Sequence, residues 1–74
     1  MKTLSPKALI GRINRRLAHE HEALRTSRGT RAEQELGRHY VLDLDRNAIL
    51  ARDIDLESYG RELGVLSEGV QVAA

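Results

Sequence analysis

The sequence predicts a single small α+β domain with the order α-β-β-α, in which a two-stranded antiparallel hairpin packs against helices. Two observations predict this class: apolar and polar residues alternate through residues 39–54, and a helix start signal stands on each side of that stretch. The chain has 74 residues, so we assign residues 1–74 to one domain and expect residues 1–4 and about 68–74 to be flexible.

The hairpin is the clearest local pattern. Between residues 39 and 44, alternation places Tyr40, Leu42 and Leu44 on one side of a strand. We expect this side to face the core, because the other side holds only Val41 as a large apolar residue. Residues 48–54 alternate less sharply, and the orientation of that strand stays open. Asp45-Arg46-Asn47 connects the two strands, and Asn47 is suited to a left-handed turn conformation.

A helix over about residues 55–63 follows the hairpin directly. Asp55 suits the N-cap because its carboxylate accepts hydrogen bonds from the free amides of the first turn. Ile54 and Tyr59 occupy the two positions of a hydrophobic staple. Gly64 stands where a helix commonly ends in a left-handed residue.

The first helix is predicted to run from about residue 6 to residue 26. Ser5 and Pro6 form a start signal, and the apolar residues that follow recur at helical spacing, namely Leu9, Ile10, Ile13, Leu17 and Leu24. Gly11 inside this helix indicates either a weak point or a close packing contact. Residues 31–36 have the composition of a short helical turn that Gly37 ends, which allows one extra turn between the first helix and the hairpin.

Composition limits the residue types that can form the core and indicates the cellular compartment of the protein. The chain contains no Phe, Trp or Cys and only two Tyr, so aliphatic side chains must fill the interior. Without cysteine there is neither a disulfide nor a thiolate metal site, which fits a reducing compartment. No stretch approaches the roughly 18 apolar residues of a membrane span. We therefore expect a cytoplasmic protein with no membrane association.

Charge is divided unevenly along the chain. Residues 1–31 carry a net charge of +6 and residues 32–74 carry −5, which gives the total of +1. Seven basic side chains form a candidate face for a nucleic acid or an acidic protein partner: Arg12, Arg15, Arg16, His19, Arg25, Arg28 and Arg31. The near-neutral total argues against indiscriminate nucleic-acid binding, and opposed halves also allow pairing between copies.

The sequence indicates no catalytic, cofactor or metal site. His19 and His21 lie about 200° apart on a helix, whereas a zinc-binding pair of this kind stands four residues apart. Residues 43–47 begin like a calcium loop, but Ala48 and Ile54 replace its glycine and its bidentate glutamate. The serines lack a recognisable histidine and acid partner. We therefore predict a protein that is not an enzyme and needs no cofactor.

Four short stretches, spread over nearly the whole chain, resemble a group of small uncharacterised bacterial proteins of similar length. They are residues 9–17 (LIGRINRRL), 36–40 (LGRHY), 46–47 (RN) and 61–66 (RELGVL). The resemblance implies a single self-contained bacterial domain, and it implies no activity.

Two classes of function remain open. The first is a non-catalytic protein-interaction or regulatory module, which the small core, the opposed charges and the unpaired strand edges favour. The alternative is a nucleic-acid-associated protein that uses the basic face of the first helix, although few aromatic residues are present for stacking. A homodimer is also expected, because a lone two-stranded ribbon is marginal in water.

Overall fold

A computed structural model describes residues 2–73. Its elements, in chain order, are β1 (Lys2–Leu4), α1 (Pro6–Leu17), the 3₁₀ helix η1 (Ala18–Glu20), β2 (Glu22–Thr26), α2 (Thr30–Leu36), β3 (His39–Asp43), β4 (Ala48–Ala51), α3 (Leu56–Glu62) and β5 (Val70–Val72). The α+β class is confirmed. The predicted order is wrong in part, because three further strands join the hairpin and the helices.

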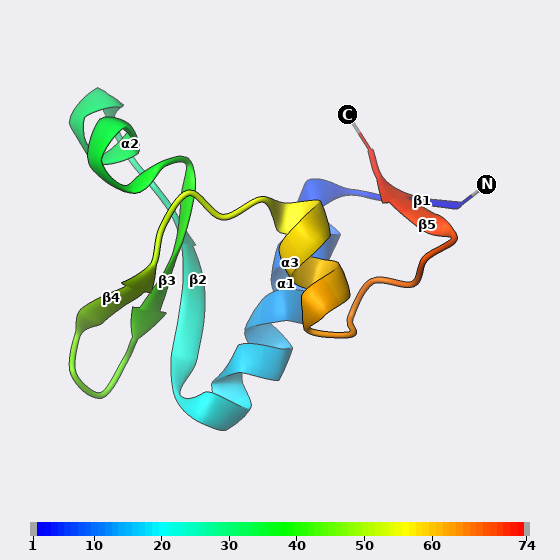
Figure 1. Ribbon diagram of the computed structural model, residues 1–74, viewed down its shortest axis with the longest axis horizontal. Coiled ribbons are helices and arrows are strands. Elements are labelled where there is room, and N and C mark those ends of the chain that lie inside the picture. The colour runs from blue at the N-terminus through cyan, green and yellow to red at the C-terminus, as the bar shows by residue number, and fades with distance from the viewer. Residues whose placement is uncertain (1, 74) are drawn as a thin grey trace.

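The described strands form two separate sheets (Figure 1). The larger sheet is antiparallel with the order β2-β3-β4, so the predicted hairpin (β3 and β4) is only two thirds of it. The smaller sheet pairs β1 with β5 in parallel and brings the two ends of the chain together. The sequence did not indicate β1 or β5, since each has three residues and its pairing partner lies at the other end of the chain.

The first helix is shorter than predicted. It ends at Leu17, and after η1 the chain turns at His21, which has the left-handed φ of 56°. Residues 22–26 then form a strand although their composition suits a helix, because pairing with β3 satisfies their backbone and buries Leu24. Leu24 therefore joins the core from a sheet and not from a helix.

The predicted core face of β3 is also wrong. Val41 is 2% exposed, whereas Leu44 is 47% exposed. The buried side is decided by β2, since Leu24 lies directly opposite Val41 and both pack with the apolar face of α1. Tyr40, Leu42 and Leu44 consequently point to the opposite side of the sheet, which we call the outer face.

The predicted helix starts are confirmed. The Ser5 hydroxyl accepts a hydrogen bond from the Ala8 N–H at 3.1 Å, and Pro6 is the first residue of α1. The Asp55 carboxylate accepts from the Ser58 N–H at 3.2 Å and from the Ser58 hydroxyl at 2.7 Å. These bonds lower the pKa of Asp55, the hydroxyl contributing most. Both helices begin where purely local chemistry predicts.

The predicted left-handed residues are confirmed, but the turn covers residues 44–47 and is one residue longer than predicted. Asn47 and Gly64 have left-handed φ values of 53° and 75°, and α2 ends at Gly37 with φ 74°. No atom lies within 4 Å of the position of an added Cβ at Gly11, so no close packing explains that glycine. Of the two interpretations of Gly11, we therefore keep the one in which this glycine is a weak point of α1.

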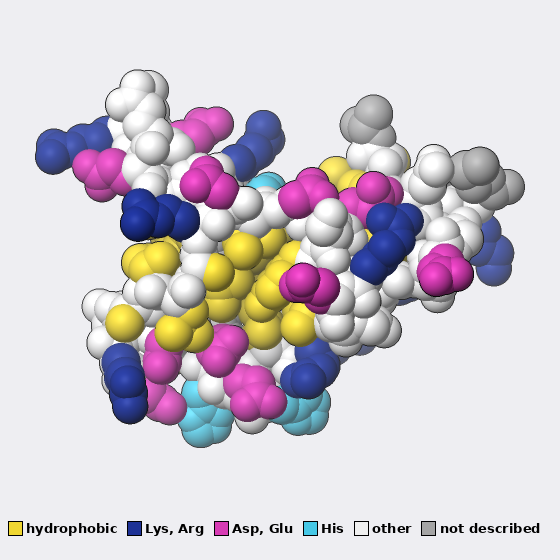
Figure 2. Space-filling model, viewed as in Figure 1, with side chains coloured by type: hydrophobic (Ala, Val, Ile, Leu, Met, Phe, Trp, Pro, Cys, Tyr) yellow, Lys and Arg dark blue, Asp and Glu magenta, His cyan; other side chains and the backbone are white. Residues whose placement is uncertain are grey.

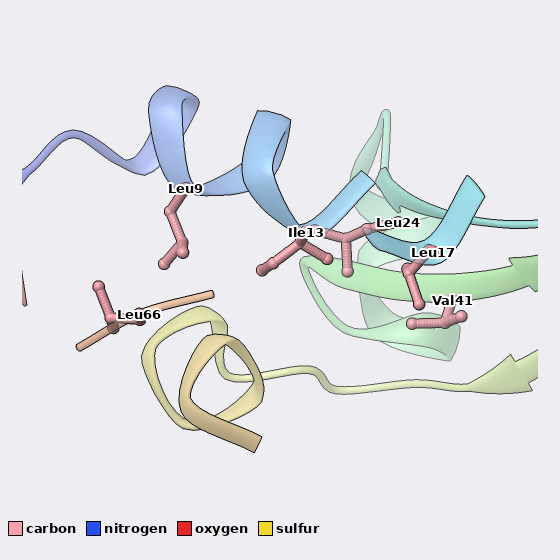
Figure 3. Close-up of a cluster of buried hydrophobic side chains, with 6 residues drawn as sticks. All are labelled: Leu9, Ile13, Leu17, Leu24, Val41 and Leu66. Atoms are coloured by element: carbon pink, nitrogen blue, oxygen red, sulfur yellow. The ribbon is translucent and has the colours of Figure 1, made fainter. Parts of the chain in front are cut away.

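The core lies where α1, the sheet and the segment after α3 meet (Figure 3). Its buried members are Leu9, Ile13, Leu17, Leu24, Val41 and Leu66. Helix α3 approaches this cluster closely because Gly60 has no side chain: an added Cβ would lie 3.0 Å from Leu9 Cδ1 and 3.3 Å from Leu66 Cβ. The core is therefore entirely aliphatic, as the composition predicts.

Asn14 joins α1 to the free edge of β2. Its side-chain Oδ1 accepts a hydrogen bond from the Leu24 N–H at 2.6 Å, and its Nδ2 donates to the Leu24 carbonyl at 3.3 Å. The amide of Asn14 thus occupies the place of a neighbouring strand for one residue. This contact blocks one edge of the three-stranded sheet and leaves β4 as the other edge.

Candidate functional site

Four of the seven predicted basic residues come together on α1 and η1. Arg12, Arg15, Arg16 and His19 line a shallow hollow of about 330 Å³, together with Val65. Two of the four already have partners within the chain. The Arg12 guanidinium donates to the Val65 carbonyl at 3.3 Å, and Arg16 lies 3.7 Å from the Glu20 carboxylate.

The other three basic residues lie elsewhere, because the first helix ends before it reaches them. Arg25 and Arg28 line a second hollow, of about 490 Å³, between β2, β3 and α2. Tyr40 lines the same hollow and stands directly opposite Arg25 on the neighbouring strand. Arg31 lies on α2, with its Nε 3.5 Å from the Glu35 carboxylate. The structure therefore divides the predicted face between separate elements.

The histidines are also separated. His21 Nδ1 lies 3.2 Å from Asp45 Oδ2, while His39 Nδ1 lies 3.1 Å from the Thr26 hydroxyl. Burial lowers the pKa of His39, and the neighbouring Arg38 charge lowers it further. Within residues 2–73, no three His, Asp or Glu side chains are placed to hold a metal ion together.

The outer face of the sheet carries a row of apolar side chains, three of which, Tyr40, Leu42 and Leu44, sequence reasoning assigned to the core. We call Tyr40, Leu42, Leu44 and Ile49 the outer stripe. Leu42 and Ile49 are direct partners across β3 and β4, and Ile49 is 44% exposed. A register shift beside this pair leaves Leu50 without a direct partner, and its side chain is 51% exposed.

Helix α2 covers only one end of the outer stripe. Its Ala32 lines a hollow with Tyr40, and its Leu36 lines another with Ile49 and Leu50. The helix has seven residues, so it spans about 10 Å and does not reach the other end of the stripe. Leu44, which lies at that other end, remains 47% exposed.

The exposed area of the whole molecule is large for its mass. A folded monomer of 8.3 kDa is expected to expose about 4,600 Å², whereas this chain exposes 5374 Å². The difference of about 800 Å² is close to the area that each partner contributes to a standard protein interface.

The inner face of the sheet is also incompletely covered. Helix α1 packs mainly against β2, and α3 packs mainly against α1, so β4 is the strand of this sheet that these two helices cover least. Figure 2 shows the result as a hydrophobic patch between the sheet and α3, bordered largely by acidic side chains. Ala51, Ile54 and Tyr59 are partly buried apolar residues from the elements on the two sides of this patch.

No protein-family model matches the chain, and neither a curated protein nor a solved structure is similar to it. The resemblance to small bacterial proteins stays a prediction. No described helix is long and apolar enough to cross a membrane. The fold and its surfaces define a small α+β domain in which the large hydrophobic residues exposed within residues 2–73, Leu44, Ile49 and Leu50, lie on or beside the three-stranded sheet.

Proposed function

We propose that this chain is a small, non-catalytic, cytoplasmic protein-interaction module whose contact surface is the outer stripe. The observation that supports this proposal most strongly is the orientation of β3. Its more apolar side, with Tyr40, Leu42 and Leu44 along it, faces away from the core. Large apolar side chains in alternation are typical of a buried strand face, and this chain does not bury them completely.

The surroundings of the stripe also suit a protein partner. Its apolar centre is flanked at one end by the hollow that holds Arg25, Arg28 and Tyr40. Interface hot spots are enriched in tyrosine and arginine, and both residue types are present at this end of the stripe. Adjacent strand β4 consists of Ala48, Ile49, Leu50 and Ala51, so this sheet edge has no charged residue within it to oppose contact.

The double variant Leu44→Lys/Ile49→Lys is expected to keep the fold and lose the partner. Each residue is about half exposed, so each substitution should change the free energy of unfolding by only about 0.5 kcal/mol. Burying two ammonium groups in an apolar contact should weaken binding at least about tenfold. The measurements are thermal unfolding, sedimentation velocity for pairing with a second copy, and quantitative cross-linking in the native host for other partners.

A matched control adds the same charge away from the stripe. Gln34→Lys/Gln71→Lys changes two exposed glutamines on α2 and β5 and should retain every partner of the unmodified chain. The proposal is contradicted if the stripe variant keeps the same assembly and the same cross-linked proteins as this control.

Nucleic-acid binding is the second candidate, and the grouping of Arg12, Arg15, Arg16 and His19 in one hollow favours it. If that hollow binds phosphates, affinity for duplex DNA or RNA should fall steeply with salt, and changing its three arginines to glutamine should abolish it. Changing Arg25, Arg28 and Arg31 to glutamine removes the same charge elsewhere and should leave that binding intact. Affinity that is absent at low salt, or that both triple variants lose equally, eliminates this candidate.

A further inference from the structure

Two neighbouring rows of side chains on the inner face of the sheet differ in their chemistry. In one row, Leu24 and Val41 lie opposite each other, with Ala51 beside Val41. In the row toward the turn, Glu22 lies directly opposite Asp43. Strand alternation places both carboxylates on the same face as the buried leucine and valine.

The Glu22 and Asp43 pair is unfavourable for the isolated chain. Like charges placed directly opposite on neighbouring strands repel each other and destabilise a sheet. Both side chains are partly buried, which weakens screening by solvent. Neither forms an ion pair with a lysine or arginine within residues 2–73, although the Asp43 carboxylate accepts hydrogen bonds from the Asp45 N–H at 2.9 Å and the Arg46 N–H at 3.2 Å. Two carboxylates therefore stand directly opposite each other on the inner face, and a single substitution would remove that arrangement.

Tyr59 of α3 lies close enough to one of these carboxylates, Glu22, to be affected by its charge. Burial raises the pKa of its phenol, and the charges of Glu22 and Glu62 raise it further, whereas Arg16 lowers it. The tyrosine thus lies near two carboxylates, Glu22 and Glu62, and near the Arg16 guanidinium. Acid groups from the sheet and from α3 therefore flank the same apolar surface.

We propose that the inner trough between the sheet and α3 is a docking site for a cationic amphipathic helix of a partner protein. An apolar stripe on that helix would cover the patch around Ala51, Ile54 and Tyr59, which are only partly buried against the core. Its lysine or arginine side chains would pair with Glu22, Asp43 and Glu62. A helix suits this surface better than a strand, because the face offers side chains and no unpaired backbone.

This proposal concerns the face opposite the outer stripe, and it does not depend on the function proposed for that stripe. The same charges explain why a second copy is a poorer occupant. In a symmetric contact through the inner trough, the acidic border would meet its own copy, and like charges would face each other.

The test uses the full chain and two designed helical peptides with the same leucine stripe, one bearing lysine and the other glutamate on its polar side. The lysine peptide should bind, with affinity that falls as salt rises, and should shift the NMR signals of Tyr59 and Ile54. The glutamate peptide should not bind. Equal binding of both peptides, or shifts confined to the outer stripe, would overturn the proposal.

The decisive variant is Glu22→Lys, because it should improve the fold while it removes the function. A lysine opposite Asp43 replaces repulsion with attraction, so the melting temperature should rise by about 2–5 °C. Affinity for the lysine peptide should fall at least about tenfold. A purely structural role for Glu22 would instead lower the melting temperature or leave peptide affinity unchanged, and either result would contradict the proposal.

Glu68→Lys is the matched control. It makes the same charge change at an exposed position between α3 and β5, and it should leave both the melting temperature and the peptide affinity nearly unchanged. If this control weakens the peptide as much as Glu22→Lys does, the binding reflects net charge alone and the docking site is disproved. Self-association that Glu22→Lys abolishes would assign the trough to a second copy and would also overturn the proposal.

Discussion

The variant Asn14→Ala is expected to lower the free energy of unfolding by about 2–3 kcal/mol, because it leaves the Leu24 N–H and carbonyl without their partner. For a domain of this size, such a loss corresponds to a fall in melting temperature of about 10 °C or more. Thermal unfolding measures the total effect. Hydrogen exchange measures the local one, since the Leu24 amide should lose protection before its neighbours in the strand.

Two further variants distinguish the stability lost with the hydrogen bonds from any stability lost through a change in the helix itself. Asn14→Asp keeps the acceptor for the Leu24 N–H but turns a carboxylate oxygen toward the Leu24 carbonyl, so it should also destabilise the chain. Arg15→Ala changes an exposed neighbour on the same helix and should have an effect within about 0.5 kcal/mol. If Leu24 amide protection is unchanged in Asn14→Ala, the edge contact does not hold β2.

The sequence did not identify Asn14 as a structural residue. One signal was present: Asn14 follows Ile13 directly. It therefore lies at the border of the apolar stripe of α1 and not in the middle of the polar side of the helix. That position suits a side chain that reaches a neighbouring element. The signal is insufficient on its own, because its partner Leu24 was assigned to the same helix.

Features that depend on a few neighbouring residues were predictable. Ser5 and Asp55 cap their helices through side chains that reach only three residues ahead, and Asn47 takes its left-handed conformation within its own turn. The segment 22–26 depends instead on a partner strand that lies about 17 residues further along. Its helical composition therefore predicted the wrong element, and the basic face assigned to one long helix was divided as a consequence.

The inward side of β3 was not predictable from alternation alone. Alternation shows that a strand has two different faces, but the buried face is the one on which Val41 and its cross-strand partner Leu24 pack with the apolar side chains of α1. In β3 the side with more apolar residues faces away from the core, and Val41, which pairs with Leu24, is the buried residue. The same error in prediction reveals the candidate interaction surface, because it concerns the residues that remain uncovered.

The variant Val41→Asp is expected to unfold the domain, and Leu44→Asp is expected to leave it folded. Val41 is 2% exposed, so an aspartate there would bury a charge among the aliphatic side chains of the core. Removing a charge from water without a partner costs several kcal/mol, which is comparable to the total stability of a small domain. Leu44 is 47% exposed, so its aspartate would stay in solvent.

A milder pair of substitutions keeps the comparison measurable if Val41→Asp does not accumulate. Val41→Ala should lower the free energy of unfolding by about 1–3 kcal/mol through lost burial and the cavity left behind, whereas Leu44→Ala should change it by about 0.5 kcal/mol or less. Urea unfolding of the four variants decides between the two orientations of β3. The opposite order of stabilities would mean that the side bearing Leu44 faces the core, as alternation alone predicts, and it would remove the outer stripe as an interaction surface.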